Sequence, residues 1–267
     1  MNPSSSTLAP SSMPRPRRRR IDAVLFDMDD TLIDWSGLKL GWEELNRPLV
    51  ANIYTFLEQL GHTLPDPDEF HSAFQRRSSE AWNQATENWS GPDFAEVLRR
   101  VCADAGLDPG GLDIDALMRA YGWQPMPGVV LYPDTVAVLQ ALREAGYALG
   151  LVTNSYFPMW MRDVELEHYQ LLDFFNVRIT ACDAGHLKPH RAIFTRALEH
   201  LDTEPERAVF VGDRPEHDIR GANDAGLISV LLDPPHLERD LDGVVPDYTI
   251  TTLSELLPIL VELEKET

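Results

Sequence analysis

The sequence predicts an α/β protein whose core is a doubly wound parallel sheet, with a block of α-helices inserted after the first strand. Two observations support this prediction. After residue 127, short apolar runs alternate with segments of helical pattern, which is typical of a parallel sheet covered by helices on both faces. Between residues 36 and 126, helical patterns follow one another with turn residues between them. We therefore expect these residues to form a separate helical unit.

The inserted helices are predicted from apolar spacing and from the residues at their ends. Leucine and isoleucine recur at spacings of three and four between residues 45 and 60, and Gly61 is a typical residue to end such a helix. The Asp-Pro pair at 66–67 predicts a second helix start, and Gly-Pro-Asp at 91–93 predicts a third. Gly106 is expected to end the third helix.

The second half of the chain supplies the remaining strands and helices of the predicted sheet. Apolar runs predict strands at residues 147–152, 177–181, 208–211 and 228–232, and amphipathic segments predict helices at 133–145, 189–201 and 218–225. Pro189 is placed at the first position of its helix, where proline is favoured.

Composition indicates a globular protein with an acidic body. The chain has 267 residues, 43% of them hydrophobic, and a formal charge of -20, which suits one large domain or two smaller ones. Residues 1–20 contain five arginines and no acidic residue, so the rest of the chain holds 18 basic against 43 acidic residues. A body this acidic repels nucleic-acid backbones and anionic membranes. We therefore expect neither as a partner.

Residues 1–20 are rich in serine, proline and arginine and are expected to form a disordered tail. Acidic residues interrupt the apolar run that follows, which argues against a signal peptide. No apolar stretch approaches the roughly 18 residues that a membrane span needs. The two cysteines, Cys102 and Cys182, lie far apart and do not suggest a disulfide framework. This usage favours the reducing cytoplasm.

Two carboxylates follow the first predicted strand, which starts at Ile21. Asp27 and Asp29 come directly after its apolar run, and residues i and i+2 of an extended segment share one face. Clustered carboxylates are costly unless a cation or a shared proton compensates. Because hard oxygen ligands suit Mg²⁺, we predict a magnesium site here.

Other polar residues fall at the carboxyl ends of later strands or just before a helix. In open α/β sheets ligands bind outside these strand ends, so we expect such residues to meet the two carboxylates. The residues are Thr153, Asn154, Lys188 and Asp213. Together the set suits a phosphoryl group with Mg²⁺, because carboxylates hold the metal while ammonium, hydroxyl and backbone N–H groups hold phosphate oxygens.

In order and spacing, these motifs resemble those of the haloacid dehalogenase superfamily of phosphotransferases. The four matching motifs are Asp27-Met28-Asp29-Asp30-Thr31, Thr153, Lys188-Pro189, and Gly212-Asp213 with Asp218. Four motifs in order are highly specific. The resemblance covers about residues 21–255 and implies a Rossmann-like catalytic core of residues 21–35 and 127–267, with a helical cap of residues 36–126.

The resemblance implies a role for each matched residue in the chemical steps. Asp27 is expected to be the nucleophile that forms an aspartyl phosphate, and Asp29 the general acid and then the general base. Thr153 and Lys188 are expected to bind the phosphoryl group, and Lys188 also to offset the charge on Asp27. For Asn154, a hydrogen bond to phosphate and a turn-stabilising role are both open.

The resemblance also implies a metal site. Asp27, Asp213 and the backbone carbonyl of Asp29 are expected to hold Mg²⁺. Thr31 is expected to brace the loop, and Asp218 to orient Lys188 or metal-bound water.

Hydrolysis of a small phosphorylated metabolite is the leading hypothesis. Asp29 disfavours the dehalogenase and phosphonatase branches, which lack a carboxylate at that position. A phosphomutase shares all four motifs and stays open. A non-catalytic interaction protein on this scaffold is disfavoured because the motif aspartates and Lys188 are present. The sequence leaves the substrate and the oligomeric state, monomer or dimer, open.

Five of the six tryptophans fall in or beside the predicted cap, namely Trp35, Trp42, Trp82, Trp89 and Trp123. They either line a substrate pocket or pack helices together, and packing is the more common use.

Overall fold

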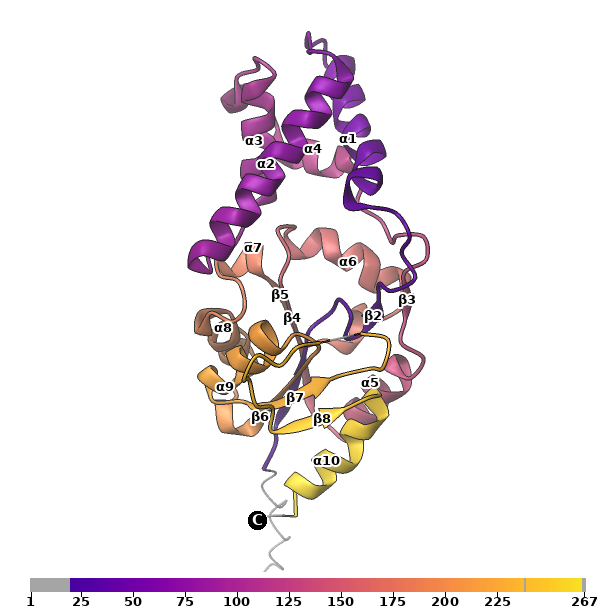
Figure 1. Cartoon of the computed structure of the whole chain (residues 1–267), viewed down its shortest axis with the longest axis vertical. Coiled ribbons are helices and arrows are strands. Elements are labelled where there is room, and N and C mark those ends of the chain that lie inside the picture. The colour runs from indigo at the N-terminus through magenta and orange to yellow at the C-terminus, as the bar shows by residue number, and fades with distance from the viewer. Residues whose placement is uncertain (1–19, 238, 266–267) are drawn as a thin grey trace, which may run out of the picture.

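A six-stranded sheet forms the centre of the computed structural model, which describes residues 20–237 and 239–265 (Figure 1). Its strand order is β5-β4-β1-β6-β7-β8, and every neighbouring pair is parallel. The strands are β1 (Ala23–Phe26), β4 (Ala148–Thr153), β5 (Val177–Thr180), β6 (Ala208–Gly212), β7 (Ile228–Leu232) and β8 (Tyr248–Ile250). The predicted α/β class is confirmed.

Helices cover both faces of this sheet. Alternate residues of β1 belong to separate hydrophobic clusters, with Val24 and Phe26 in one and Ala23 and Leu25 in the other. This is the period-two pattern of a strand buried on both faces. One cluster includes residues of α5 (Thr135–Glu144), α6 (Met159–His168) and α10 (Leu256–Leu263), and the other includes residues of α8 (Arg191–Leu201) and α9 (Arg220–Ala225).

The order of the strands places a switch point at β1. From β1 the chain continues to β4 and β5 on one side, then crosses to β6, β7 and β8 on the other side. Phe26 is in register with Leu151 of β4 and with Val211 of β6. The residues that follow these strand ends therefore lie near one another, at the position where open α/β sheets bind ligands.

A layer of helices lies beyond the sheet at one end of the molecule (Figure 1). It consists of α1 (Trp42–Gln59), α2 (Pro67–Asn88), α3 (Phe94–Asp104) and α4 (Ile114–Tyr121). The chain enters after β2 (Ile33–Asp34) and leaves before β3 (Val130–Leu131), and these two strands pair antiparallel. The predicted division into a core of residues 21–35 and 127–267 and a cap of residues 36–126 stays a prediction. Its two boundaries fall close to the antiparallel pair of β2 and β3.

Side-chain caps explain where the inserted helices begin. Asp66 accepts a hydrogen bond from the backbone N–H of Asp68, and Asp93 accepts one from Ala95, as is typical of aspartate before a helix. These two starts were predicted. α4 was not among the predicted helices, although Asp113 caps it in the same way.

The loop between α2 and α3 lies against the core. The backbone N–H of Gly91 donates to the carbonyl of Gly185 at 2.7 Å, and that of Leu187 donates to the carbonyl of Trp89 at 2.9 Å. Gly91 allows this close approach, because an added Cβ would lie 2.1 Å from the carbonyl oxygen of Ala181. The helical layer is thus anchored beside residue 188.

One element prediction needs correction, and some elements, α6 among them, were not predicted. The helix predicted from Pro189 begins instead at Arg191, with His190 as its capping residue, and the Lys188-Pro189 peptide bond is cis. Pro189 therefore precedes the helix rather than starting it. α6 was not predicted, because the buried Arg162 and Glu165 interrupt the apolar pattern on its inner face.

The predicted disordered tail lies outside the described residues up to residue 19. Arg20, which the prediction included in the tail, donates its backbone N–H to Oε2 of Glu264 at 3.0 Å. Both Cys102 and Cys182 are free thiols. Among the described residues, none of the helices has the length and apolar character to cross a membrane.

Replacing Gly91 by Ala is expected to lower the free energy of unfolding by about 1–3 kcal/mol, the usual cost of overpacking, because the Ala181 carbonyl must shift. Urea unfolding measures this change. Gly111→Ala is the matched control in the same helical layer, since nothing lies within 4 Å of a Cβ added there. Equal stability of the two variants would contradict the close contact.

Candidate active site

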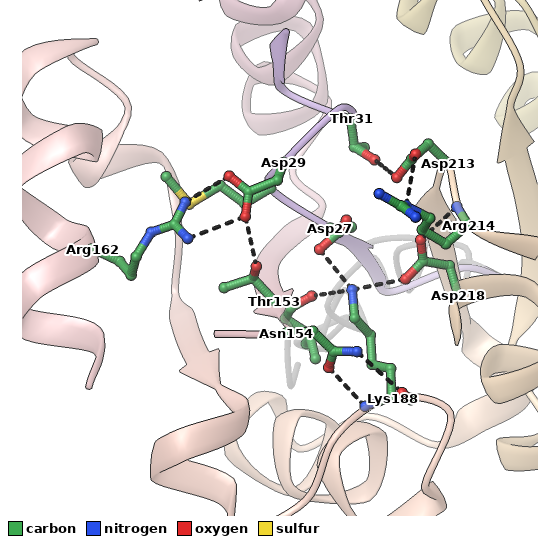
Figure 2. Close-up of polar contacts among 12 residues, drawn as sticks. Asp27, Asp29, Thr31, Thr153, Asn154, Arg162, Lys188, Asp213, Arg214 and Asp218 are labelled. Carbon is green, nitrogen blue, oxygen red and sulfur yellow. Dashed lines mark hydrogen bonds and ion pairs between the residues drawn. The ribbon is translucent and has the colours of Figure 1, made fainter. Parts of the chain in front are cut away.

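Residues from four separate segments meet at the carboxyl edge of the sheet (Figure 2). Asp27 follows β1, Thr153 ends β4, Lys188 precedes α8 and Asp213 follows β6. Asp218 comes from the π-helical turn Pro215–Ile219, directly before α9. All five side chains are buried. The structure thus brings together residues that the sequence placed far apart.

Lys188 lies between two carboxylates. Its Nζ is 2.6 Å from Oδ1 of Asp27 and 2.7 Å from Oδ1 of Asp218, and it donates to the carbonyl of Val152 at 2.9 Å. Lys188 is only 1% exposed. Burial lowers its pKa, but the carboxylates of Asp218 and Asp27 outweigh that effect and raise the pKa of Lys188 above its usual value. The lysine is therefore charged and offsets the charge on Asp27.

Three carboxylates form a cluster at this position. Oxygens of Asp27, Asp213 and Asp218 all lie within 4.8 Å of one another. Burial raises the pKa of Asp27 well above its usual value, although Lys188 lowers it. Burial, with the charge of Asp218, raises the pKa of Asp213 to about 7, although Arg239 contacts its Oδ2. Lys188 and Arg239 therefore do not fully compensate the cost of burying the charged carboxylates of Asp27 and Asp213.

This donor set fits a hard divalent cation. The clustered atoms are carboxylate oxygens, which Mg²⁺ and Ca²⁺ prefer as ligands. A cation among them would restore the charged form of Asp27 and Asp213, whose pKa values burial has raised.

Thr31 lies next to the cluster, and Asp218 makes a further contact besides those within it. Oγ1 of Thr31 donates to Oδ1 of Asp213 at 3.5 Å, and Oδ2 of Asp218 accepts the backbone N–H of Arg214 at 2.9 Å. Asp218 contacts Lys188 directly, so the geometry agrees with the predicted orienting role.

Asn154 holds the backbone of Lys188. Its Oδ1 accepts the Lys188 N–H at 2.8 Å, and its Nδ2 donates to the Lys188 carbonyl at 3.1 Å. Both polar atoms of the amide are therefore engaged in this structure (Figure 2). Of the two roles left open by the sequence, the geometry favours stabilisation of the loop over a hydrogen bond to phosphate.

Asp29 points away from Lys188 and toward a residue that sequence reasoning missed (Figure 2). Arg162 of α6 donates Nη2 to Oδ1 of Asp29 at 2.7 Å and Nη1 to Oδ2 at 3.1 Å. The indole N–H of Trp35 also donates to Oδ1 at 2.8 Å. The Oγ1 of Thr153 lies 3.5 Å from Oδ2. Asp29 is thus held at the margin of the carboxylate cluster.

A second carboxylate holds Arg162 in turn. Nε of Arg162 is 2.6 Å from Oε2 of Glu165, which also accepts the indole N–H of Trp123 at 2.8 Å. Glu165 is fully buried, and Arg162 is 5% exposed. The i, i+3 spacing of the pair was the available signal in the sequence, but α6 was not recognised.

A cavity of about 270 Å³ opens onto these groups. Core residues including Asp27, Thr153 and Lys188 line one side. Trp82 and Thr86 of α2, with Trp89 at its end, line the other. The helical layer therefore contributes part of the wall of this cavity.

Comparison with known proteins gives a consistent result. The family model described as haloacid dehalogenase-like hydrolase matches residues 21–226. A glyceraldehyde 3-phosphate phosphatase of Methanopyrus kandleri is 34% identical over 92% of this chain and 100% of its own length. Pyrophosphatase PpaX of Bacillus mycoides is 28% identical over 90% of this chain and 97% of its own. Among solved structures, a HAD phosphatase from Thermococcus onnurineus is 30% identical with a TM-score of 0.57, over 90% of this chain and 98% of that one.

Replacing Arg162 by Met is expected to destabilise the fold by about 3–5 kcal/mol, because it leaves the buried Glu165 without its charged partner. Guanidinium chloride unfolding measures the loss. Arg100→Met is the control, because the Arg100–Glu96 pair at 2.9 Å is exposed and such pairs contribute less than about 1 kcal/mol. A loss no larger than that of the control would contradict the role of Arg162.

Proposed function

The chain belongs to the haloacid dehalogenase-like hydrolases, as a phosphatase, and from this premise we propose that it hydrolyses a small phosphate monoester with Mg²⁺, through an aspartyl phosphate on Asp27. The buried contact of Lys188 with Asp27 at 2.6 Å carries the proposal. It holds a carboxylate in one place at the carboxyl end of β1, where ligands of such sheets bind. Relatives that act on small phosphorylated compounds support the same substrate class.

The first step transfers the phosphoryl group to Asp27. Lys188 binds Oδ1, and we expect Oδ2 to attack phosphorus, so that an Asp27–phosphorus bond forms and the bond to the leaving oxygen breaks. Asp29 gives its proton to that oxygen. The Thr153 hydroxyl and the Lys188 ammonium bind the equatorial phosphoryl oxygens, whose charge they offset.

The second step releases phosphate. Asp29, now a carboxylate, accepts a proton from water as the water oxygen attacks phosphorus, and the Asp27–phosphorus bond breaks. In this step Arg162 and Trp35 hold the Asp29 carboxylate in one orientation. The helical layer excludes bulk water from the cavity during the reaction.

Mg²⁺ would be held by Asp27, by Asp213 and by the backbone carbonyl of Asp29. When bound, it supplies positive charge beside the phosphoryl oxygens. Thr31 contacts Asp213, and Asp218 contacts Lys188, which pairs with Asp27 in turn. Thr31 and Asp218 therefore orient the groups that do the chemistry. We place the reaction in the cytoplasm, and the two free thiols support that compartment.

Replacing Asp27 by Asn is expected to lower kcat for p-nitrophenyl phosphate by roughly 10³-fold or more, because the amide cannot serve as the nucleophile. Wild-type activity is expected to disappear on chelation with EDTA and to return with Mg²⁺. Asp224→Asn, an exposed substitution on α9, is the control. Full activity of the Asp27 variant would exclude the covalent mechanism, and phosphate shift within a substrate without release would indicate a mutase.

Replacing Asp29 by Asn is expected to slow steady-state turnover by roughly 10²–10⁴-fold and to separate the two steps. p-Nitrophenolate leaves without a proton, so a burst of about one equivalent per site should precede slow turnover, since the water of the second step lacks its base. An alkyl phosphate should show no burst. Rapid-quench measurements follow both products. Wild-type turnover of both esters would remove Asp29 from the mechanism.

A further inference from the structure

A second cavity adjoins the one that contains Asp27. Its volume is about 410 Å³, which is within the range of pockets that bind small ligands. The two cavities share the lining residues Asp29, Asp30, Trp82, Asn154 and Arg214. Asp29 therefore stands at their junction, with the phosphoryl site on one side and the second cavity on the other.

Aromatic rings in contact form a wall of the second cavity. Trp42 contacts Trp123 at 5.9 Å between ring centroids, and Trp123 contacts Phe157 at 4.6 Å. Phe157 contacts Tyr156 at 4.4 Å, and Tyr156 contacts Trp82 at 5.8 Å. All five rings line the cavity. They come from α1, α2, the segment after α4 and the loop after β4, so the wall forms only when the helical layer lies on the core.

Three polar side chains that line this cavity, those of Trp35, Trp123 and Arg162, already have partners. Trp35, which also lines it, donates its indole N–H to Asp29, and Trp123 donates its own to Glu165. The Arg162 guanidinium pairs with both of these carboxylates. The ring wall thus offers mainly aromatic surface, and the guanidinium of Arg162 beside it is already paired.

We propose that this second cavity binds the leaving group of the substrate and that the leaving group is aromatic. The inference rests on the proposed function. With the phosphoryl group beside Asp27 and the scissile oxygen beside Asp29, the alcohol part of the ester extends past Asp29 into the cavity. A planar ring there stacks on indole rings and buries apolar surface.

A charged leaving group would fit this cavity less well. It would lose hydration against the ring wall, which has no unpaired cation to replace the lost water. Arg214 is half exposed and lies at the junction of the cavities, where it faces the phosphoryl side as well. We therefore expect the preference to differ from that of a relative that acts on pyrophosphate.

The experiment compares 2-phenylethyl phosphate with glycerol 1-phosphate, two esters of primary alcohols with similar chemical reactivity. We expect kcat/KM to be about tenfold higher for the phenylethyl ester. Trp42→Ala should lower the ratio of the two kcat/KM values about fivefold, since Trp42 is part of the ring wall. Trp160→Ala is the matched control. The two tryptophans are 42% and 43% exposed, and Trp160 does not line the cavity.

Calorimetry on the Asp27→Asn variant tests the cavity without turnover, and the phenylethyl ester should bind more tightly than glycerol 1-phosphate. The inference would be overturned if the phenylethyl ester bound no more tightly and reacted no faster than glycerol 1-phosphate. It would also be overturned if the Trp42 and Trp160 substitutions changed the ratio of the two kcat/KM values equally. Tighter binding of the phenylethyl ester with no hydrolysis of either compound by the wild type would support the cavity assignment and reject the proposed function.

Discussion

A buried lysine between two buried carboxylates is the interaction on which this site depends. Lys188 contacts Asp27 and Asp218 and has almost no exposed surface. Charges at this depth are tolerated only when each is paired, because water no longer solvates them. The three residues come from the end of β1, the loop before α8 and the turn after β6. Their mutual attraction therefore fixes the relative positions of three segments at the carboxyl edge of the sheet.

The orientation of Asp29 is linked to the placement of the helical layer. Trp35 lies between β2 and α1, where the chain enters that layer, and Trp123 lies between α4 and β3, where it leaves. Trp35 donates a hydrogen bond to Asp29 directly. Trp123 is linked to Asp29 indirectly, because it donates to Glu165, which pairs with Arg162, and Arg162 donates to Asp29. A shift of the helices would move these indoles and change the position of the Asp29 carboxylate. The aromatic wall depends on the same placement, so the position of Asp29 and the shape of the second cavity are linked.

Most residues of the site could be predicted because they follow buried strands. Parallel strands in register bring their carboxyl ends to one edge of the sheet. Asp27, Thr153 and Asp213 therefore lie near one another regardless of the structure of the segments between them. Arg162 could not be predicted in this way. It is a charged residue on the inner face of a helix, where the apolar period fails, and its partner Asp29 is 133 residues away. Only the folded chain brings the two together.

The sequence by itself determined the α/β class, the strand-end carboxylates, Lys188 and the helical insertion. These depend on local patterns, since apolar runs, capping residues and strand ends are properties of adjacent residues. The tertiary structure places the amide of Asn154 on the backbone of Lys188, which favours the loop-stabilising role. It also decided that tryptophans distant in the chain line one cavity beside Asp29. Side-chain partners are chosen by the packing of segments from different parts of the chain, and that packing is absent from any single stretch of sequence.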